Sequence, residues 1–260
     1  MSKKIYLSPS NQSDNTYATG GTNEMAQCDK IAKATEKALK RCGFEVKVGK
    51  SGDTMANRCA ESDRFNADIH MPIHTNAFNG KVTGGTRIFC YSSAAENVNP
   101  AKAVLKTLGA ISPGTADSVS YNKGLYEINT PKAVTVYVEV EFHDTKTGSD
   151  WIRSNTVKIG EAICKGLCNH FGIAYKADDS KKEDKPNTSG SFKRYIIRIT
   201  SSNGVNIRKG PGTNYAITGA VPKGGAYTII EEKSGTGAKK WGKLKSGAGW
   251  IALDYTQKIK

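Results

Sequence analysis

The stretch Ala67-Asp-Ile-His-Met-Pro-Ile-His-Thr-Asn-Ala77 reads as a buried strand that ends in polar residues. It follows a helical pattern at Met55–Phe65 and precedes a second apolar run at Thr86–Tyr91. Strands that alternate with helices in this way form an open α/β sheet, in which reactive groups lie at the carboxyl ends of the strands. We therefore expect His74, near the end of this strand, to project a ring nitrogen into a cleft.

The same alternation continues on both sides of this stretch. The elements expected before it are a strand at Ile5–Leu7, a helix at Glu24–Arg41 and a strand at Phe44–Val48, and those expected after it are a helix at Pro100–Leu108, a strand at Val134–Phe142 and a helix at Trp151–Phe171. Residues 1–175 are thus predicted to form an α/β domain with an open, mostly parallel sheet and helices on both faces.

Composition changes after this domain. Residues 176–191 contain no large apolar residue and are predicted to be a solvated linker. Short apolar runs separated by Gly and Pro follow, at 195–199, 205–208, 216–221, 227–232, 241–244 and 250–253. This pattern predicts a small all-β, SH3-like barrel over residues 192–260.

Charge is unevenly distributed along the 260 residues, whose formal net charge is +14. Residues 176–260 hold 17 Lys and Arg against 7 Asp and Glu. Such a basic surface attracts a polyanion, and charge alone leaves nucleic acid, anionic lipid and an anionic cell-wall polymer open. Nothing resembles a helix-turn-helix, a zinc knuckle or an RNA-binding aromatic motif, so we expect no nucleic-acid partner.

Targeting signals are not visible in the sequence. No run approaches the ~20 apolar residues of a membrane span, and the start MSKKIYLSPSNQ lacks the features of a signal peptide. We expect a protein made in the cytoplasm, with reduced cysteines and no stable membrane insertion. Cys164 and Cys168 lie one helical turn apart near His170, which fits either a metal cluster or a buried helix face.

Candidate chemistry centres on carboxylates and imidazoles near strand ends. Glu24 opens the first long helix, Glu139 and Glu141 lie in an otherwise apolar run, and His143 follows that run. A buried carboxylate is costly unless it is paired or bound to a metal. Together with His74 these residues suggest a zinc hydrolase site. The alternative is that Glu24 only stabilises a helix N-terminus and that the histidines are core residues.

Two families share these motifs. Residues 3–175 resemble the zinc-dependent N-acetylmuramoyl-L-alanine amidases (amidase type 3) of phage endolysins and bacterial autolysins, through Ile5–Gln12, Gly20–Glu24, Ala67–Ala77, Gly84–Thr86 and Val138–Phe142. Residues 195–259 resemble a bacterial SH3-type wall-binding domain, through Gly204–Tyr215, Trp241–Leu244 and Gly249–Ile251. A wall-lytic domain joined to a wall-binding domain is the usual plan of an endolysin.

The amidase resemblance implies roles for particular residues. Glu24 and His74 would ligate Zn²⁺, and Glu139 would be the general base for hydrolysis of the amide between N-acetylmuramic acid and L-alanine. The family's first histidine ligand is replaced here by Asn11, a weak zinc ligand. We favour His143 as the third ligand, with Asn11 and His70 as the alternatives.

His70 precedes His74 by four residues, roughly 13 Å along a strand, so it would need a bulge to reach the same ion. Pro72 between them removes a ladder donor and suggests a sheet edge or a bulge.

The SH3-type resemblance suggests a groove that takes wall peptide or glycan. Its expected lining is aromatic, and basic residues would attract anionic wall polymers: Tyr215, Trp241, Trp250 and Tyr255, with Arg208, Lys209, Lys239, Lys240, Lys243 and Lys245. The alternative is that both tryptophans are core residues and the lysines form a solvated face.

The combined prediction is a peptidoglycan hydrolase of Gram-positive hosts that is released from the cytoplasm at lysis. The alternatives are a lapsed amidase that only binds the wall and a hydrolase that cuts a different wall bond. The oligomeric state is left open.

Overall fold

The computed structural model describes residues 2–80, 84–178 and 194–259. The chain divides into two compact units, Met1–Lys181 and Lys182–Lys260. Most of the predicted linker, residues 176–191, lies outside the described residues, so its boundaries stay a prediction. Among the described helices, none combines the length and apolar character that a membrane span requires.

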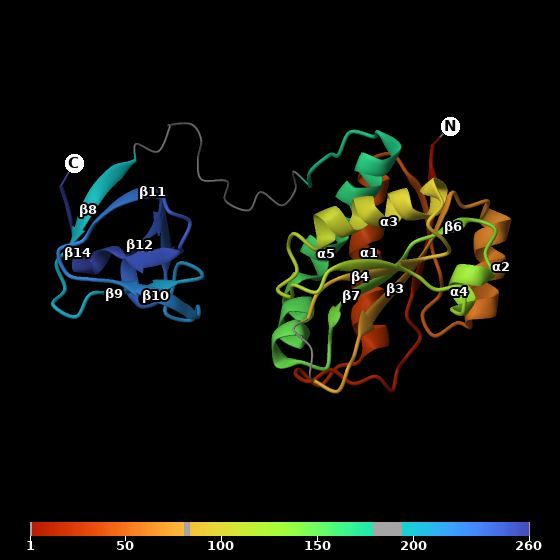
Figure 1. Cartoon of the computed structure of the whole chain (residues 1–260), viewed down its shortest axis with the longest axis horizontal. Helices are drawn as coiled ribbons and strands as arrows, with labels where there is room; N and C mark the ends of the chain where they lie inside the picture. The colour runs from red at the N-terminus through yellow and green to blue at the C-terminus, as the bar shows by residue number, and fades with distance from the viewer. Residues whose placement is uncertain (1, 81–83, 179–193, 260) are drawn as a thin grey trace. The chain divides into compact units, whose positions relative to one another are not determined.

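The N-terminal unit is built on one twisted sheet that is parallel except at a single pair of strands (Figure 1). Its strands run in the spatial order β2 (Glu45–Val48), β1 (Lys4–Pro9), β3 (Ile69–Asn76), β7 (Tyr137–Phe142), β4 (Arg87–Cys90) and β5 (Ser118–Tyr121), with β6 (Val134–Thr135) also pairing with β3. Among the described strands of this sheet, β4 and β7 alone pair antiparallel. The predicted open, mostly parallel sheet is confirmed.

Helices cover both faces of this sheet. The three long helices, α1 (Glu24–Arg41), α3 (Ala95–Leu108) and α5 (Lys146–Phe171), pack together on one face (Figure 1). The shorter α2 (Met55–Phe65) and α4 (Tyr126–Asn129) lie on the other. Both α3 and α5 begin five residues before their predicted starts, and the sequence patterns missed β5 and α4.

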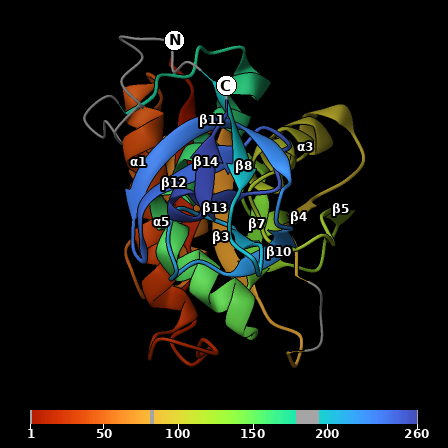
Figure 2. The ribbon, with the colours of Figure 1, turned by 90° about the vertical axis from the view of Figure 1, so that its left-hand side faces the viewer.

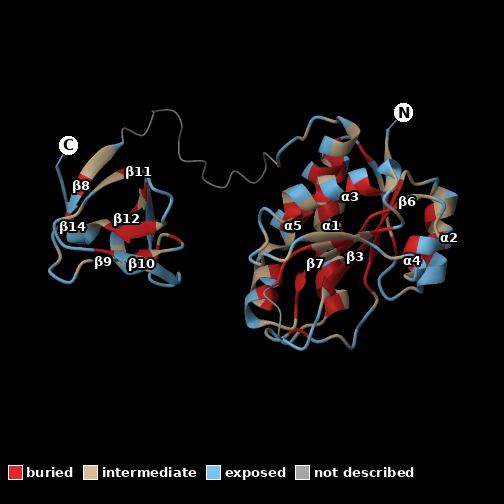
Figure 3. Ribbon diagram, in the orientation of Figure 1, coloured by how far each residue is buried: buried red, intermediate tan, exposed pale blue. Residues whose placement is uncertain are grey.

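The two faces of the sheet carry different residue types, because side chains alternate along a strand. Ile5, Leu7, Met71, Ile73 and Val138 belong to the apolar core beneath the long helices, and the strands β3 and β7 are largely buried (Figure 3). The intervening side chains lie on the opposite face, where Tyr6 contacts α2 and where Ser8 and His70 contact α4. They are largely polar or aromatic: Tyr6, Ser8, His70, His74, Tyr137 and Glu139. All the candidate chemistry of these strands therefore lies on one face.

Pro72 lies in the central strand β3 rather than at a sheet edge. The partner of β3 changes from β6, opposite Ile69 and His70, to β7, opposite Ile73 and His74. Pro72 falls where this ladder is interrupted: the N–H group of Val136 donates to the His70 carbonyl at 3.0 Å, and Pro72 has no N–H group with which to continue the ladder. The expected edge position is wrong, and the bulge that was the alternative lies after His74 rather than at the proline.

The C-terminal unit is an antiparallel β structure around its own core (Figure 2). Its strands run in the order β10 (Ile217–Val221), β9 (Val205–Arg208), β13 (Trp250–Ala252), β12 (Ala238–Leu244), β11 (Ala226–Gly235), β8 (Tyr195–Ile199) and β14 (Thr256–Lys258). Trp241, Ile229 and Ile251 are among its most buried side chains. The predicted all-β, SH3-like domain is confirmed.

Candidate active site

Glu24 and His74 meet at the carboxyl end of β3. Asn23 caps α1 by accepting a hydrogen bond from the N–H of Ala26 at 2.9 Å, which fixes Glu24 as the first helical residue. The Oε1 atom of Glu24 lies 2.8 Å from Nδ1 of His74, and both residues are buried. The Tyr137 ring stacks on the imidazole with 4.7 Å between the centroids. The two residues that were predicted as metal ligands are thus brought together.

Two amide side chains from the loop after β1 complete the surroundings of this pair, and the sequence analysis did not single them out. Asn15 Nδ2 donates to Glu24 Oε2 at 2.8 Å, and Gln12 Nε2 lies 3.4 Å from His74 Nδ1. Their positions in the Ser/Asn-rich loop carried no signal beyond their polarity. The amides hold the second carboxylate oxygen and limit where the imidazole can turn.

The Glu24–His74 pair favours its charged form. Burial opposes ionisation of Glu24, but hydrogen bonds from His74, Asn15 and Ser10 outweigh it and hold the pKa of this carboxyl below its ordinary value. Burial also opposes protonation of His74, while its hydrogen bond to Glu24 and the charges of nearby carboxylates raise its pKa overall. A proton therefore lies between Glu24 and His74, and both of these groups are also good ligands for a divalent cation.

Glu139 lies opposite His74 in the register of β3 and β7. Burial raises its pKa from 4.5 to about 7, against the opposing charges of His74 and Arg87 and with a contribution from Glu24. Part of the side chain stays accessible, but Oε2 is fully buried and accepts no hydrogen bond within the described residues. A carboxylate of this kind is an acceptor without a partner and titrates near neutrality, which suits a general base.

Glu141, two residues further on, has a structural role. Its Oε1 accepts from the backbone N–H groups of Gly85 and Phe142, both at 2.8 Å, and its Oε2 accepts from Ser112 and from the N–H of Gly114 at 3.1 Å. A Cβ atom on Gly84, whose φ is +77°, would lie 2.6 Å from Oε1 of this carboxylate. Glu141 thus organises two loops, and its hydrogen bonds offset the cost of its burial.

The residues at this position fit a bound divalent cation in part. A carboxylate and an imidazole face each other, and a second carboxylate nearby, that of Glu139, has an unpartnered buried oxygen. Among the described residues, however, no third His, Cys, Asp or Glu ligand atom lies within 4.8 Å of both Glu24 and His74. Glu24 and His74 are the side chains that would hold zinc.

The favoured third ligand, His143, lies in a separate hydrogen-bonded group. Its Nδ1 lies 2.9 Å from both the hydroxyl and the carbonyl oxygen of Thr75, and its ring stacks on Tyr17 at 4.9 Å. Tyr17 in turn donates to the Thr75 hydroxyl at 3.0 Å. His143 therefore does not lie together with Glu24 and His74, and the role of His143 as a zinc ligand stays a prediction.

The two alternative third ligands are also engaged elsewhere. The Asn11 side chain donates to the carbonyl of Asp53 at 3.0 Å. His70 Nε2 lies 3.1 Å from Glu127 Oε1, a residue of α4 that the sequence analysis missed. The bulge between β3 and β7 falls after His74 and not between the two histidines, so it does not bring His70 closer to His74.

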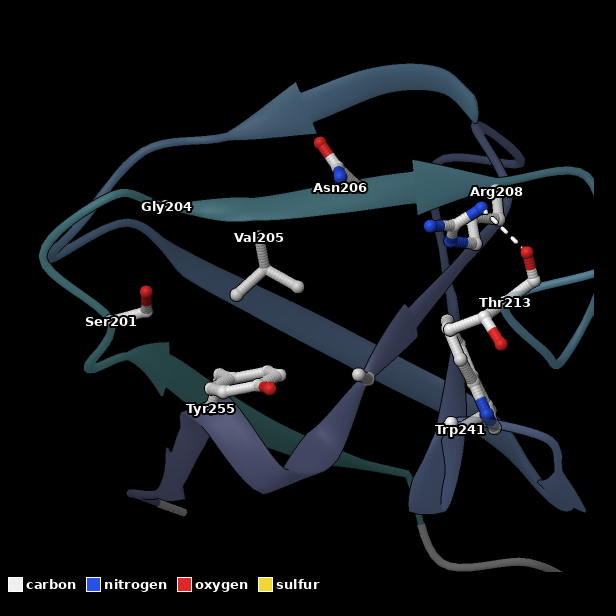
Figure 4. Close-up of a pocket in the computed structure, with 10 residues that line it drawn as sticks. Ser201, Gly204, Val205, Asn206, Arg208, Thr213, Trp241 and Tyr255 are labelled. Atoms are coloured by element: carbon white, nitrogen blue, oxygen red, sulfur yellow. Dashed lines mark hydrogen bonds between the residues drawn. The ribbon is translucent and has the colours of Figure 1, made fainter. Parts of the chain in front are cut away.

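A hollow of about 240 Å³ in the C-terminal unit is the candidate wall-binding site (Figure 4). Tyr255 and Trp241 lie at opposite ends of it, and Arg208 lines it while donating to the carbonyl groups of Thr213 and Tyr215 at 3.1 and 2.7 Å. Two of the four predicted aromatic residues therefore line this hollow.

The other predicted wall-binding residues have different surroundings. Tyr215 is exposed, whereas Trp250 is 7% exposed and lies beneath Lys233 and Lys243, whose Nζ atoms are 5.6 and 5.8 Å from its ring. Lys209, Lys239, Lys240 and Lys245 are exposed. Their roles in wall binding stay predictions.

The raised pKa of Glu139 makes the stability of the metal-free protein depend on pH. The native state holds a proton that the unfolded chain releases above pH 4.5, so this stabilisation is complete below 4.5 and is lost as the pH rises through about 7. Glu139→Gln removes this pH-dependent contribution to stability. The unfolding free energy of the variant, relative to the parent, should increase by roughly 3 kcal/mol between pH 4.5 and 8. Urea titrations with a chelator present measure it, and parallel pH curves for the two proteins would contradict it.

Comparison with known proteins identifies both units. A family model described as N-acetylmuramoyl-L-alanine amidase matches residues 5–169, and one described as bacterial SH3 domain matches residues 203–257. An uncharacterized 38.4 kDa protein of Clostridium perfringens is 28% identical over a 230-residue alignment that covers 83% of this chain. The match spans 66% of that relative's length.

Solved structures share the fold of the N-terminal unit. The catalytic domain of CwlV, an N-acetylmuramoyl-L-alanine amidase from Bacillus (Paenibacillus) polymyxa var. colistinus, superposes with a TM-score of 0.59 at 16% identity over 66% of this chain and 99% of that one. The catalytic domain of CD27L endolysin, which targets Clostridia Difficile, gives 0.57 at 20% identity over 64% of this chain and 97% of that one. Because the amidase model spans more than half of the residues, the chain belongs to the N-acetylmuramoyl-L-alanine amidase family.

Proposed function

We propose that this protein hydrolyses the amide bond between N-acetylmuramic acid and L-alanine in peptidoglycan, with zinc as its cofactor. The observation that carries the proposal is the unpartnered buried oxygen of Glu139 beside the Glu24–His74 pair. A carboxylate, an imidazole and a separate carboxylate base are the groups that zinc hydrolases use. Family membership supplies the substrate class.

Glu24 and His74 would hold the zinc ion. A zinc ion bound at such a site is a Lewis acid that polarises a carbonyl group and lowers the pKa of water to about 7. Asn15 fixes the second oxygen of Glu24, and Tyr137 fixes the plane of the His74 ring. These contacts orient both ligands before any ion arrives, which reduces the reorganisation that binding requires.

Glu139 would move the proton. With a pKa near 7 it is partly ionised at neutral pH, so it can take a proton from the attacking water and return it to the leaving amine of L-alanine. Its oxygen without a partner is available for that water, whereas both oxygens of Glu141 are occupied by four hydrogen bonds. We therefore assign the base to Glu139 and not to Glu141.

The C-terminal unit would bind the wall. Its hollow between Trp241 and Tyr255 suits a wall peptide or glycan, and its exposed lysines would attract anionic wall polymers at long range. The likeness of the N-terminal fold to the catalytic domain of an endolysin favours release to the wall of a Gram-positive host at phage lysis. Localisation and host are parts of this proposal.

A lapsed amidase that only binds the wall is the second candidate. The observation that favours it is the placement of Asn11, His70 and His143, each of which has a hydrogen-bond partner away from the Glu24–His74 pair. Two protein ligands would hold zinc more weakly than three. The metal content of the purified protein separates this candidate from the enzyme.

Digestion of purified Gram-positive cell walls tests the proposal. We expect new amino-terminal alanine to appear, to vanish when a zinc chelator is added and to return with added zinc. A new amino terminus on another residue would assign a different wall bond. Wall binding without any new amino terminus, from a protein that contains no metal, would support the lapsed amidase.

A further inference from the structure

A second group of potential metal ligands is buried on the polar face of the sheet, away from the candidate active site. Cys59 of α2, His70 of β3 and Glu127 of α4 each offer a ligand atom, and these three atoms lie within 4.8 Å of one another. The residues are 1%, 0% and 2% exposed. Glu24 and His74 are not members of this group, and none of its residues takes part in the proposed hydrolysis.

Burial of these groups needs a physical explanation. A carboxylate and an imidazole inside a protein lose their hydration, and the 3.1 Å contact between His70 and Glu127, with a hydrogen bond from Ser8 to Glu127, offsets only part of that loss. The Nδ1 atom of His70 is buried and has no hydrogen-bond partner among the described residues. The thiol of Cys59 adds a third polarisable donor beside the pair. The contact between His70 and Glu127 leaves this second ring nitrogen without a partner.

The surroundings hold these donors in place. The Ser8 hydroxyl donates to the same Glu127 oxygen that contacts His70, and the Tyr6 ring stacks on the imidazole with 5.4 Å between the centroids. The hydroxyl of Thr135 donates to the backbone carbonyl of Glu127 at 3.1 Å. Contacts of this kind orient metal ligands, and a thiolate, an imidazole and a carboxylate form a donor set for zinc or a similar borderline divalent ion.

We propose that Cys59, His70 and Glu127 form a second, structural site for a zinc-class divalent cation. A bound ion ties α2 and the four-residue helix α4 to the central strand β3, on the sheet face that the long helices leave open. The thiolate, the carboxylate and a divalent ion together carry no net charge, so the buried group is neutral when it is occupied. This proposed site does not depend on whether the chain is an active amidase.

Cobalt substitution of the full-length protein tests this site. The protein is stripped of metal with a chelator under reducing conditions and is then titrated with Co²⁺, whose bond to a thiolate gives a charge-transfer absorption in the near ultraviolet. We expect this absorption in the parent protein and in His74→Ala, and its loss in Cys59→Ser. Absence of the absorption from the parent protein would overturn the proposal.

A second thiol group provides the matched control. Cys42, Cys164 and Cys168 are also buried together in the apolar core near the end of α1. The Sγ atom of Cys164 lies 3.6 Å from that of Cys42 and 3.9 Å from that of Cys168. We expect Cys164→Ser to keep the cobalt absorption. An absorption that survives Cys59→Ser would place the cobalt-bound thiolate elsewhere and overturn the site. Its loss in Cys164→Ser would then assign that thiolate to the second thiol group.

Thermal unfolding gives an independent readout that needs no cobalt. In His74→Ala, zinc should still raise the unfolding midpoint, because an ion that binds only the native state stabilises it by mass action. Adding Cys59→Ser to His74→Ala should abolish that increase, while adding Cys164→Ser should leave it unchanged. If zinc does not shift the midpoint of His74→Ala, the second site does not exist.

Discussion

Glu139→Gln should lower the rate of peptidoglycan hydrolysis by a factor of about 10² to 10⁴ and leave wall binding unchanged. Glutamine keeps the shape of the side chain but cannot accept the proton of the attacking water. One oxygen of Glu139 is buried and accepts no hydrogen bond within the described residues, so replacing that oxygen breaks no such contact. The release of amino-terminal alanine from purified walls measures the rate.

Glu96→Gln is the matched control, because Glu96 is exposed on α3. It makes the same chemical change and should leave both the rate and wall binding as they are. If Glu139→Gln abolishes binding as well as hydrolysis, the division of labour between the two units is wrong. A rate equal to that of the parent protein would remove Glu139 from the mechanism.

Trp241→Ala should unfold the C-terminal unit rather than only weaken wall binding. Its indole is 2% exposed and belongs to the core of that unit. Truncating a buried tryptophan costs about 3–5 kcal/mol, and a domain of this size has little more stability than that. Denaturant titrations of the full-length protein, followed by near-ultraviolet circular dichroism, should lose the transition of this unit.

Tyr255→Ala separates binding from folding at the same hollow. Tyr255 lines the hollow but is 51% exposed, so its removal should weaken wall binding without unfolding the unit. Trp241→Phe should keep the fold while it removes the indole N–H, which is buried and unpartnered among the described residues. If Trp241→Ala folds normally and loses only wall binding, the indole is a ligand contact and not a core residue.

The sequence predicted the fold wherever hydrophobic periodicity was strong. The helices at Glu24–Arg41 and Met55–Phe65 have the expected bounds, and so do the strands at Tyr195–Ile199 and Val205–Arg208. Short elements without a clear period, such as α4, were missed. Glu127 was missed with α4, because its role depends on a contact with His70, 57 positions away along the chain.

The candidate site was predictable in its residue types but not in its detailed contacts. Glu24 and His74 were expected to meet, and they do. The different roles of Glu139 and Glu141 were hidden from the sequence, since both alternate with valines in one strand and only the bulge near its end separates their surroundings. The neighbours of His143 likewise depend on how the chain turns after β7.

The alternation of side chains along β3 has a consequence for how such a protein can evolve. Met71 and Ile73 secure the core, while His70 and His74 carry chemistry on the opposite face. Substitutions on the chemical face can therefore accumulate without opening cavities beneath the long helices. A lineage can lose or exchange a metal ligand and still inherit a stable scaffold on which a new activity can be selected.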